Sequence, residues 1–559
     1  MRFEYQFVSA MEKIFCRQNL TAEKVLSPAG GQLQAVRGGF AAVQLALKCD
    51  FNVELEFTAS PPEGVSLSLR EVGLVPCDMP SSPGNHDAFT SEPGLFPDPL
   101  LELEKPVRLT CGNWHAVFIT ADVSLDCSPG SYSIPLEIKT YQHSGCPWKL
   151  PFDFQEKIDL RLVVHASGLA PQKLICTNWF YCDCLAHYYK VPLWSEDFWV
   201  LARNYWSNMA ANGRNMLLVP LWTPPLDTAI GHERPVTQLL KIYWKNGCFS
   251  FDFSLLKKFL DTAQSCGITC FEMVHLFTQW GAEATPLIMV ETEKGKEKLF
   301  GWHVPSTAPL YRKFLNALLP ELADFLKKEN LKGKVYFHIS DEPTEKKLQV
   351  YSQASALVRE YLPEKDFPII DALSYIEFYR KKLLSIPVAS VTHWHDFEQQ
   401  PLRERWCYFA GDMEKYTTSA FGVPSGQNRI IGVLLYLYKM DGFLHWGHNF
   451  WFSQYSLDFD LDPWRDTTAG KAFSGGGAFN VYPGKDGRPV ESLHYKIFSL
   501  ALQDLRLFRT LEEKIGFEAV KELIHQGLDY EITMDHFPRS SEWFESLYLR
   551  ILEKLSESR

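Results

Sequence analysis

Short runs of alternating apolar and polar residues dominate the first part of the chain. Phe51 to Ser60 reads FNVELEFTAS, the run SYSIPLEIKT follows the turn Ser128-Pro129-Gly130, and KIDLRLVVHAS ends near Ser167. Alternation with a period of two predicts strands that bury one face. Turns rich in Gly, Pro and Asp separate the runs, and no long amphipathic helix interrupts them. We therefore expect residues 1–168 to form a β-sandwich.

From Gln172 the pattern changes, because apolar runs now alternate with stretches of helical periodicity. This alternation is typical of a parallel α/β fold. The helix that Ser195 can cap carries Glu196 and Asp197 in its first turn, which suits the helix dipole. Further helices are expected near residues 254–267, 309–328, 348–362 and 429–440. The candidate strands are residues 173–180, 215–222, 269–277, 334–340, 367–374, 387–394, 405–410 and 442–447.

Eight strand–helix units predict a (β/α)8 TIM barrel over residues 172–490. The alternative is an open doubly wound sheet, which would favour a glycine-rich phosphate loop after an early strand, and no GxGxxG stands there. The sequence beyond about Leu493 is strongly helical. Residues 491–559 are expected to be a helical C-terminal segment that packs on the barrel.

Composition narrows the classes of partner. No apolar run approaches the roughly 20 residues of a membrane helix, and the N-terminus lacks the features of a signal peptide, so we expect a cytoplasmic protein without a membrane partner. The net charge of -11 predicts no nucleic-acid partner, because phosphate binding needs a basic face. The 13 cysteines are odd in number and irregularly spaced, which indicates free thiols rather than a disulfide framework.

Two adjacent acids follow the fourth predicted barrel strand. The sequence Val335-Tyr-Phe-His-Ile-Ser340 leads directly into Asp341-Glu342-Pro343. In TIM barrels the active site lies at the C-terminal ends of the strands. Two neighbouring carboxylates tend to raise one pKa, which helps to make a general acid at neutral pH. Asp341 and Glu342 are therefore the candidate catalytic residues; at a helix entry they could also be a solvated pair.

The other predicted strand ends carry aromatic and polar side chains. The chain has 16 tryptophans and 14% aromatic residues, and aromatic rings stack on the apolar faces of sugars. A ring of such groups at one barrel mouth indicates a pocket for a neutral sugar, and no cofactor is expected. The candidate substrate-binding residues are Trp179, Trp222, His275, Trp280, Tyr375, His393, Trp394, Tyr408, Trp446, Asn449 and Trp451.

A metal-dependent hydrolase is a competing interpretation. In a strand His393 and His395 would share a face and could ligate one metal, with His338 or Asp371 as further ligands. Nothing in the sequence fixes those further ligands, so we predict no metal site. A serine hydrolase with a GxSxG elbow is not indicated, because that motif is absent.

Several blocks resemble glycoside hydrolase family 123, also catalogued as domain of unknown function 4091. They are HISDEPT, DGFLHWGHNFW followed by DPW, and AFNVYPGKDGRPVESL, which occur in the family's order. The upstream stretch WHAVFITADVSLDCSPGSYSIPLEI is similar to the family's sandwich domain. The resemblance covers roughly residues 100–525. It implies a β-sandwich followed by a (β/α)8 barrel, a glycan substrate and no metal.

The resemblance also implies an exo-acting, retaining β-N-acetylgalactosaminidase whose substrate takes part in catalysis. Asp341 would orient the acetamido group of the sugar, and Glu342 would be the general acid and base. Two alternatives stay open. One is a double-displacement glycosidase with Glu342 as acid/base and Asp412 or Glu414 as nucleophile. The other is a non-catalytic glycan-binding protein on the same barrel.

Overall fold

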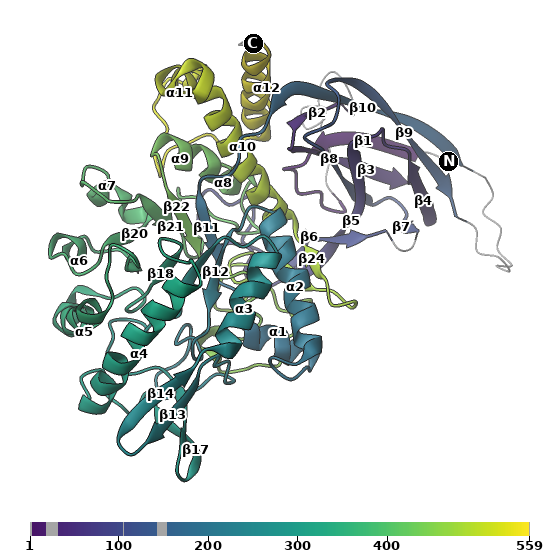
Figure 1. The fold of residues 1–559 in the computed structure, drawn as a ribbon. Coiled ribbons are helices and arrows are strands. Elements are labelled where there is room, and N and C mark those ends of the chain that lie inside the picture. Colours follow the sequence, from purple (N-terminus) through teal and green to yellow (C-terminus); the bar gives the residue numbers. More distant parts are fainter. Residues whose placement is uncertain (1–2, 18–31, 104–105, 142–153, 558–559) are drawn as a thin grey trace, which may run out of the picture. The chain divides into compact units, whose positions relative to one another are not determined.

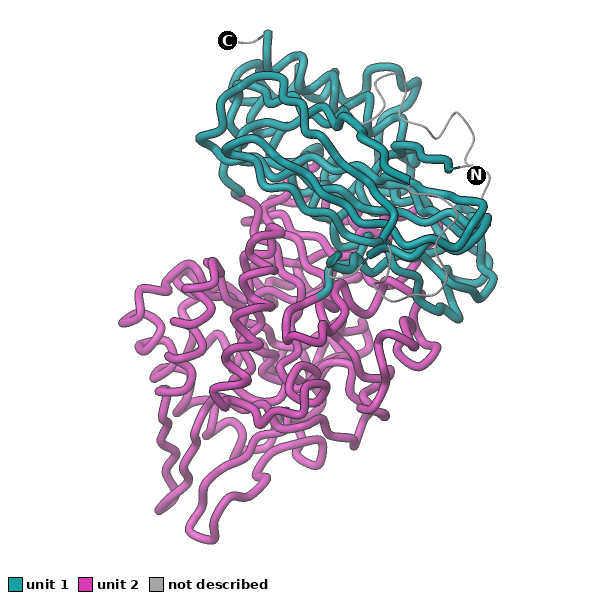
Figure 2. The backbone as a smooth tube through the Cα atoms, turned by 90° about the vertical axis from the view of Figure 1, so that its right-hand side faces the viewer, with its two compact units in different colours: residues 1–172, 419–437, 490–559 teal, residues 173–418, 438–489 magenta. Residues whose placement is uncertain are grey.

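The computed structural model describes residues 3–17, 32–103, 106–141 and 154–557. The chain divides into two compact units, drawn in different colours in Figure 2. The first unit contains residues 1–172, 419–437 and 490–559. The second contains residues 173–418 and 438–489.

The N-terminal part of the first unit is rich in β-structure, as predicted. One five-stranded sheet has the order β1 (Phe3–Ser9), β3 (Phe40–Cys49), β8 (Trp114–Val123), β5 (Val65–Cys77) and β6 (Gly94–Glu102). The other has the order β2 (Gln32–Arg37), β10 (Gln155–Gly168), β9 (Gly130–Thr140), β4 (Val53–Ala59) and β7 (Val107–Leu109). Both sheets contribute to one apolar cluster, for example Val43 and Ile119 from the first and Leu136 and Leu160 from the second. The two sheets therefore share one core, and their arrangement as a β-sandwich stays a prediction.

The C-terminal helices belong to the first unit. They are α10 (Leu493–Ile515), α11 (Phe517–His525) and α12 (Ser541–Glu557). Helix α10 packs against α8 (Gly426–Arg429), α9 (Ile431–Leu437) and β6, and α12 packs against β10. The partners of α10 therefore include helices of the connection before the last barrel strand as well as an N-terminal strand. A buried ion pair between Arg429 and Asp504, 2.8 Å apart, joins α8 to α10.

The second unit is built on an eight-stranded parallel sheet. Its order is β18 (Val335–Phe337), β15 (Cys270–Met273), β12 (Met216–Val219), β11 (Ile175–Asn178), β22 (Gly442–His445), β21 (Trp406–Tyr408), β20 (Ile386–Ser390) and β19 (Ile370–Leu373). This is the cyclic order of a (β/α)8 barrel. The two end strands meet through a bridge between Phe337 and Ile369, which nearly closes the cylinder. All eight predicted strands are confirmed, and their buried faces explain why they read as continuous apolar runs.

Helices connect most of these strands, as Figure 1 shows. Helix α2 begins as predicted, because the Ser195 hydroxyl accepts a hydrogen bond from the Phe198 N–H at 3.2 Å. The connection between β20 and β21 contains the short helix α7, in agreement with the little sequence available there. The helices of the second unit are α1 (Cys182–Tyr189), α2 (Glu196–Ala211), α3 (Ser254–Ser265), α4 (Pro309–Lys328), α5 (Leu348–Tyr361), α6 (Glu377–Arg380) and α7 (Trp394–Phe397).

A further sheet of the second unit was not predicted. Its order is β14 (Cys248–Asp252), β13 (Lys241–Lys245), β16 (Ile288–Thr292) and β17 (Gly295–Phe300). These strands come from the connections that follow β12 and β15, and they project from the barrel in Figure 1. Two short strands, β23 (Val481–Pro483) and β24 (Pro489–Glu491), follow the barrel in sequence.

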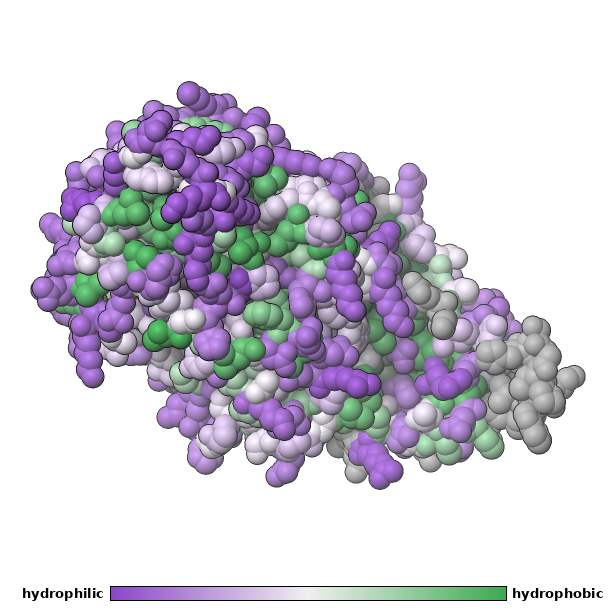
Figure 3. All heavy atoms as spheres, turned by 90° about the horizontal axis from the view of Figure 1, so that it is seen from below, coloured by the Kyte–Doolittle hydropathy of each residue, from purple (hydrophilic) through white to green (hydrophobic). Residues whose placement is uncertain are grey.

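No helix among the described residues is long and apolar enough to cross a membrane. On the face drawn in Figure 3, hydrophobic side chains occur in several groups that hydrophilic side chains separate. Scattered apolar groups of this kind are normal for a protein surface and mark no docking face by themselves.

The packing of strands β21 and β22 predicts that no side chain fits at Gly442. This residue pairs with Trp406 across β21 and β22, and a Cβ atom at Gly442 would lie 2.0 Å from Cδ2 of the Trp406 ring. We expect Gly442→Ala to lower the free energy of unfolding by about 1–3 kcal/mol, because the indole must move within a packed core. Urea unfolding measures this. Gly94→Ala is the control, since its nearest atom would be 3.7 Å away and little change is expected; equal stability of both variants would contradict the prediction.

Candidate active site

Asp341 and Glu342 line one small cavity at the C-terminal end of the barrel strands. Its volume is about 240 Å³. This is below the roughly 300–1,000 Å³ of sites for drug-sized ligands, so it suits a single small ring. A third carboxylate, Asp227, lines it too. The aromatic lining residues are Trp179, Tyr181, Trp280, Tyr408, Trp446, Tyr455 and Phe473.

Four residues that line this cavity have an unfavourable backbone conformation. Glu342, Asp227, Trp280 and Tyr455 have φ angles of 40°, 42°, 62° and 59°. Non-glycine residues rarely adopt this left-handed conformation, and such strain persists only where the surroundings enforce it. At Asp227 the enforcing contacts are specific: its N–H donates to Gln279 Oε1 at 2.6 Å, and its Oδ2 accepts the Tyr455 N–H at 3.1 Å. The cavity wall is therefore held in one conformation.

The two acids experience different surroundings. Burial and the neighbouring Glu342 carboxylate raise the pKa of Asp341 well above its usual range, although the charged His338 ring opposes the shift. Glu342 Oε1 accepts a hydrogen bond from the Tyr408 hydroxyl at 2.5 Å. Burial raises the pKa of Asp227 to about 6, even though Arg234 and the Tyr455 N–H favour its charged form. The cavity therefore contains three carboxyl groups, and the charges of Glu342 and Asp227 both contribute to the raised pKa of Asp341.

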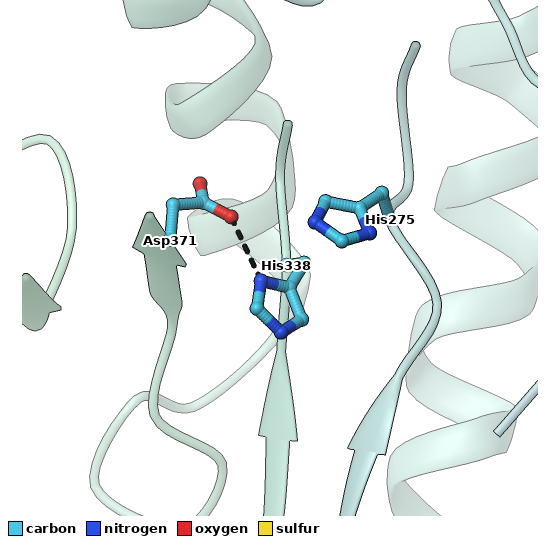
Figure 4. Close-up of side chains that lie close together, drawn as sticks. All are labelled: His275, His338 and Asp371. Atoms are coloured by element: carbon cyan, nitrogen blue, oxygen red, sulfur yellow. Dashed lines mark hydrogen bonds and ion pairs between the residues drawn. The ribbon is translucent and has the colours of Figure 1, made fainter. Parts of the chain in front are cut away.

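A buried polar network lies beside Asp341 and Glu342. His338 Nδ1 is 3.1 Å from Asp371 Oδ1, and His338 Nε2 is 3.0 Å from Glu272 Oε2 (Figure 4 shows the Asp371 contact). Burial alone would lower the pKa of His338, but these two carboxylates raise it to about 9. The ring is therefore an imidazolium at neutral pH, with both nitrogens donating. The His275 ring stacks on it with centroids 4.2 Å apart.

The same region has the only donor set that could hold a metal among the described residues. His275, His338 and Asp371 offer ligand atoms within 4.8 Å of one another. A metal ligand must be a neutral imidazole with a free nitrogen, yet both His338 nitrogens already face carboxylates. Burial and the His338 charge lower the pKa of His275 well below its usual range, so this ring is neutral and, of the two imidazoles, is the one that keeps the form a metal needs. The three residues therefore surround a charged, hydrogen-bonded His338 ring and do not offer three free ligand atoms to a metal.

The predicted pair His393 and His395 does not form a metal site. Strand β20 ends at Ser390, and the following residues form a 3-10 turn and helix α7, so positions two apart no longer share a face. His393 Nδ1 lies 2.9 Å from Thr392 Oγ1. The exposed His395 lies 3.5 Å from its neighbour Asp396.

A comparison with family models decides the family. The model of the glycoside hydrolase 123 catalytic domain matches residues 179–511, which is more than half of the chain. The chain belongs to glycoside hydrolase family 123. The match contains the strand end with Asp341 and Glu342, and it makes this protein a glycoside hydrolase with a glycan as its substrate. No curated protein matches the chain.

One solved structure agrees with the fold of this family 123 hydrolase over its whole length. A family 123 glycoside hydrolase from Clostridium perfringens, studied for glycolipid glycan hydrolysis, aligns with a TM-score of 0.73 and 13% identity over 100% of this chain and 98% of its own. At this identity the likeness concerns the fold alone. A family 2 member from Bacteroides cellulosilyticus aligns at 11% identity with a TM-score of 0.26, over 79% of this chain and 46% of its own. That score is too low to add to the assignment.

The cavity of the family 123 hydrolase brings together some of the predicted sugar-binding residues. Besides Asp341 and Glu342, four of them line it: Trp179, Trp280, Tyr408 and Trp446. Trp280 packs edge-on against Tyr455, with ring centroids 5.8 Å apart, and Trp446 lies 4.9 Å from Phe473. These pairs give the cavity aromatic walls.

The remaining predicted residues lie outside the cavity lining. Trp222 is buried and donates to the His275 carbonyl at 3.1 Å. Asn449 acts on the cavity indirectly, because its side chain accepts from the Tyr181 N–H at 2.8 Å and donates to the Tyr181 carbonyl at 3.0 Å. Trp451 donates to the Val481 carbonyl at 3.2 Å.

Two further predicted aromatic residues lie elsewhere on the hydrolase barrel. Trp394 is buried beneath Arg405, whose guanidinium is 4.9 Å from its ring. Tyr375 is exposed, and the centroid of its ring lies 6.4 Å from that of the His393 ring. The two candidate nucleophiles of the double-displacement alternative, the buried Asp412 and the exposed Glu414, do not line the cavity either.

Most other lining residues of the hydrolase were not predicted from the sequence. Tyr181 is two positions after Trp179, and that spacing at a strand end could have indicated it. Asp227, Tyr455 and Phe473 lie in long connections, and Asp227 and Tyr455 have positive φ angles that no local pattern predicts. Gln279 also lines the cavity and accepts a hydrogen bond from the Asp227 N–H.

The coupling of the two acids predicts the effect of removing one charge. In Glu342→Gln the pKa of Asp341 should fall, because the like charge that raises it is gone. Titration of carboxyl carbon signals in aspartate-labelled protein measures the shift. Asp227 is the internal control, since burial, Arg234 and Tyr455 set its pKa, and it should keep its value of about 6. An unchanged or higher Asp341 pKa in the variant would contradict the coupling.

Proposed function

We propose that this glycoside hydrolase removes single β-linked N-acetylhexosamine residues, with β-N-acetylgalactosaminides as first candidates, and retains the anomeric configuration. The observation that supports this is one cavity of about 240 Å³ that two adjacent acids reach from the same strand end. Double displacement needs carboxylates about 5–5.5 Å apart on opposite sides of the scissile bond. Adjacent acids on one strand end are better suited to assist a nucleophile that the substrate itself provides.

In the proposed reaction the acetamido oxygen attacks the anomeric carbon. The bond from that carbon to the leaving oxygen breaks, and Glu342 gives its proton to the leaving oxygen. Asp341 accepts a hydrogen bond from the acetamido N–H and balances the positive charge that develops on the oxazolinium ring. Glu342 then takes a proton from water, which attacks the same carbon and opens the ring. Two inversions at one carbon retain the configuration.

The coupled acids link protonation to substrate binding. Near neutral pH the pair holds one proton, because two adjacent charges are unfavourable in a partly buried cavity. A hydrogen bond from the acetamido N–H favours the charged form of Asp341, so binding moves the shared proton to Glu342. The general acid is then ready when the correct substituent is present. A sugar with a 2-hydroxyl in place of the acetamido group provides neither this switch nor a nucleophile.

The rest of the cavity suits a neutral pyranose. The aromatic walls offer surfaces for the C–H faces of the ring, while Asp227 and Gln279 can accept or donate hydrogen bonds to hydroxyl groups. The glycolipid glycans of the Clostridium perfringens relative are one class of donor to test.

A series of aryl N-acetylgalactosaminides with one, two or three fluorines on the acetyl methyl group tests the mechanism. Fluorine withdraws electrons from the acetamido oxygen, so kcat/KM should fall with each fluorine if that oxygen attacks. A thiazoline mimic of the oxazoline should inhibit competitively. If kcat/KM does not change with the number of fluorines, and a 2-fluoro sugar forms a covalent adduct with the enzyme, the results would instead support double displacement. The fluoro-sugar adduct would identify the nucleophile, and Asp227 is the third carboxylate in reach of the cavity.

Variants of the two acids give a second prediction. We expect Asp341→Asn and Glu342→Gln each to lower kcat by about 10²–10⁴-fold, the usual contribution of a positioned acid or base. Aryl glycosides with good leaving groups should partly restore bond cleavage in Glu342→Gln only, because they need no proton. Glu414→Gln is the matched control, since this exposed acid lies outside the cavity lining and its variant should keep wild-type turnover. Binding of sugars without any turnover by the wild type would favour a glycan-binding protein.

A further inference from the structure

The barrel is closed least well beside the catalytic strand. Strand β18 ends at Phe337, whose N–H donates to the Pro368 carbonyl at 3.0 Å. The bridge from Phe337 to Ile369 is the pairing between the two end strands of the sheet. The next residues, 338–342, leave the sheet and carry the acids into the cavity. Their backbone N–H groups need partners other than a neighbouring strand.

The Asp371 carboxylate supplies those partners. Its Oδ1 accepts the Ile339 N–H at 3.1 Å, and its Oδ2 accepts the Ser340 N–H at 3.3 Å. The same carboxylate accepts hydrogen bonds from His338 Nδ1 and from the Tyr351 hydroxyl. The Asp371 side chain of β19 thus accepts the hydrogen bonds that backbone carbonyls of a neighbouring strand would otherwise accept. This happens at the seam of the barrel, where the end strands β18 and β19 meet. Hydrogen bonds to an ionised acceptor are stronger than those between neutral groups, which suits a segment under strain.

The opposite edge of the same segment is held by the chain after β15. The Leu276 N–H donates to the His338 carbonyl at 3.0 Å, and the Phe277 N–H donates to the Ile339 carbonyl at 2.9 Å. The Trp280 N–H donates to the Asp341 carbonyl at 2.7 Å. Three carbonyls on this edge thus have partners from the chain after β15, and the Asp371 carboxylate accepts two N–H groups on the other edge, where β18 and β19 meet.

His338 holds this carboxylate in place, and its charge favours the ionised form of Asp371 against the effect of burial. Its ring bridges Asp371 to Glu272, and Glu272 Oε2 in turn accepts the indole N–H of Trp179 at 3.2 Å. Trp179 lines the cavity. One buried network thus connects a wall of the cavity to the backbone immediately before Asp341.

We propose that Asp371 is a positioning residue: it replaces the missing strand partner of residues 339–340 and, with His338 and Glu272, fixes the orientation of Asp341 and Glu342. The inference rests on the proposed function only in taking these two acids as the catalytic pair. A displacement of about 1 Å at reacting groups can cost about 10²-fold in rate, so the network should matter for turnover and not only for folding.

Kinetics of Asp371 variants test the proposal. Asp371→Ala should lower kcat about 100-fold with little change in KM, because the cavity walls persist while the acids lose their orientation. Asp371→Asn keeps an acceptor oxygen for the backbone N–H groups and should recover part of the loss. Rates are expressed per folded molecule, measured by circular dichroism. A folded Asp371→Ala protein with wild-type kcat would overturn the proposal.

Asp504→Asn is the matched control. Asp504 is a buried carboxylate that pairs with Arg429 at 2.8 Å, within the first unit. Its replacement leaves a buried cation without its partner and should lower stability, as replacement of Asp371 does. The kcat of the folded protein should stay at the wild-type value. Equal losses of kcat in both variants would mean that Asp371 acts through stability alone and would overturn the proposal.

A measurement on the wild-type protein needs neither activity nor a variant. The amide hydrogens of Ile339 and Ser340 should exchange as slowly as those of the barrel strands, and histidine labelled with nitrogen-15 should show both His338 nitrogens protonated at neutral pH. Fast exchange at both amides, or a neutral His338 ring, would overturn the proposal even if the enzyme is active. If the wild type cleaves no glycoside, the proposed function fails, and this measurement alone decides the positioning role.

Discussion

The hydrogen bonds from the backbone of Ile339 and Ser340 to the Asp371 carboxylate connect the barrel to the chemistry at its mouth. In this barrel the residues after Phe337 leave the sheet, which deprives the N–H groups of Ile339 and Ser340 of strand partners. The structure replaces them with a buried side chain from the neighbouring strand. The left-handed backbone of Glu342 and the cavity wall formed by Trp179 both depend on the segment that this carboxylate holds.

The charges of the site follow from the same arrangement. Glu272 and Asp371 are fully buried, and both contact the His338 ring. Burial of Asp341 and the neighbouring Glu342 carboxylate raise the pKa of Asp341; the charge of His338 opposes this shift, and that of Asp371 adds to it. The fold thus favours the protonated form of Asp341, and the proposed mechanism needs a proton in this cavity for its general acid.

Much of the fold could be predicted from the sequence, because it depends on patterns that repeat. The eight barrel strands are short apolar runs, and a helix start such as Ser195 has a local signature. The sheet formed by β13, β14, β16 and β17 could not be predicted, because its strands come from two connections that are far apart in sequence and are brought together only by the fold. For the site, the strand end with Asp341 and Glu342 could be read directly from the rule that barrel enzymes work at that end.

The outer parts of the site could not be derived in the same way. Trp222 and Trp451 follow strands just as Trp179 does, and all three are buried, yet only Trp179 lines the cavity; packing alone decides between them. Asp227 and Tyr455 reach the cavity through positive φ angles in long connections. The sequence indicated His338 only as a possible metal ligand, whereas its contacts are with Glu272 and Asp371, which are far away in sequence.

The three carboxylates of the cavity also limit what else can enter it. Among the lining residues that the structure describes there is no lysine, arginine or histidine to receive an anion. A sulfate ester or a carboxylate on the terminal sugar would be placed against like charge in a space too small to keep its hydration shell. Acidic decorations would therefore protect a glycan chain from this enzyme, and another enzyme would have to strip them first.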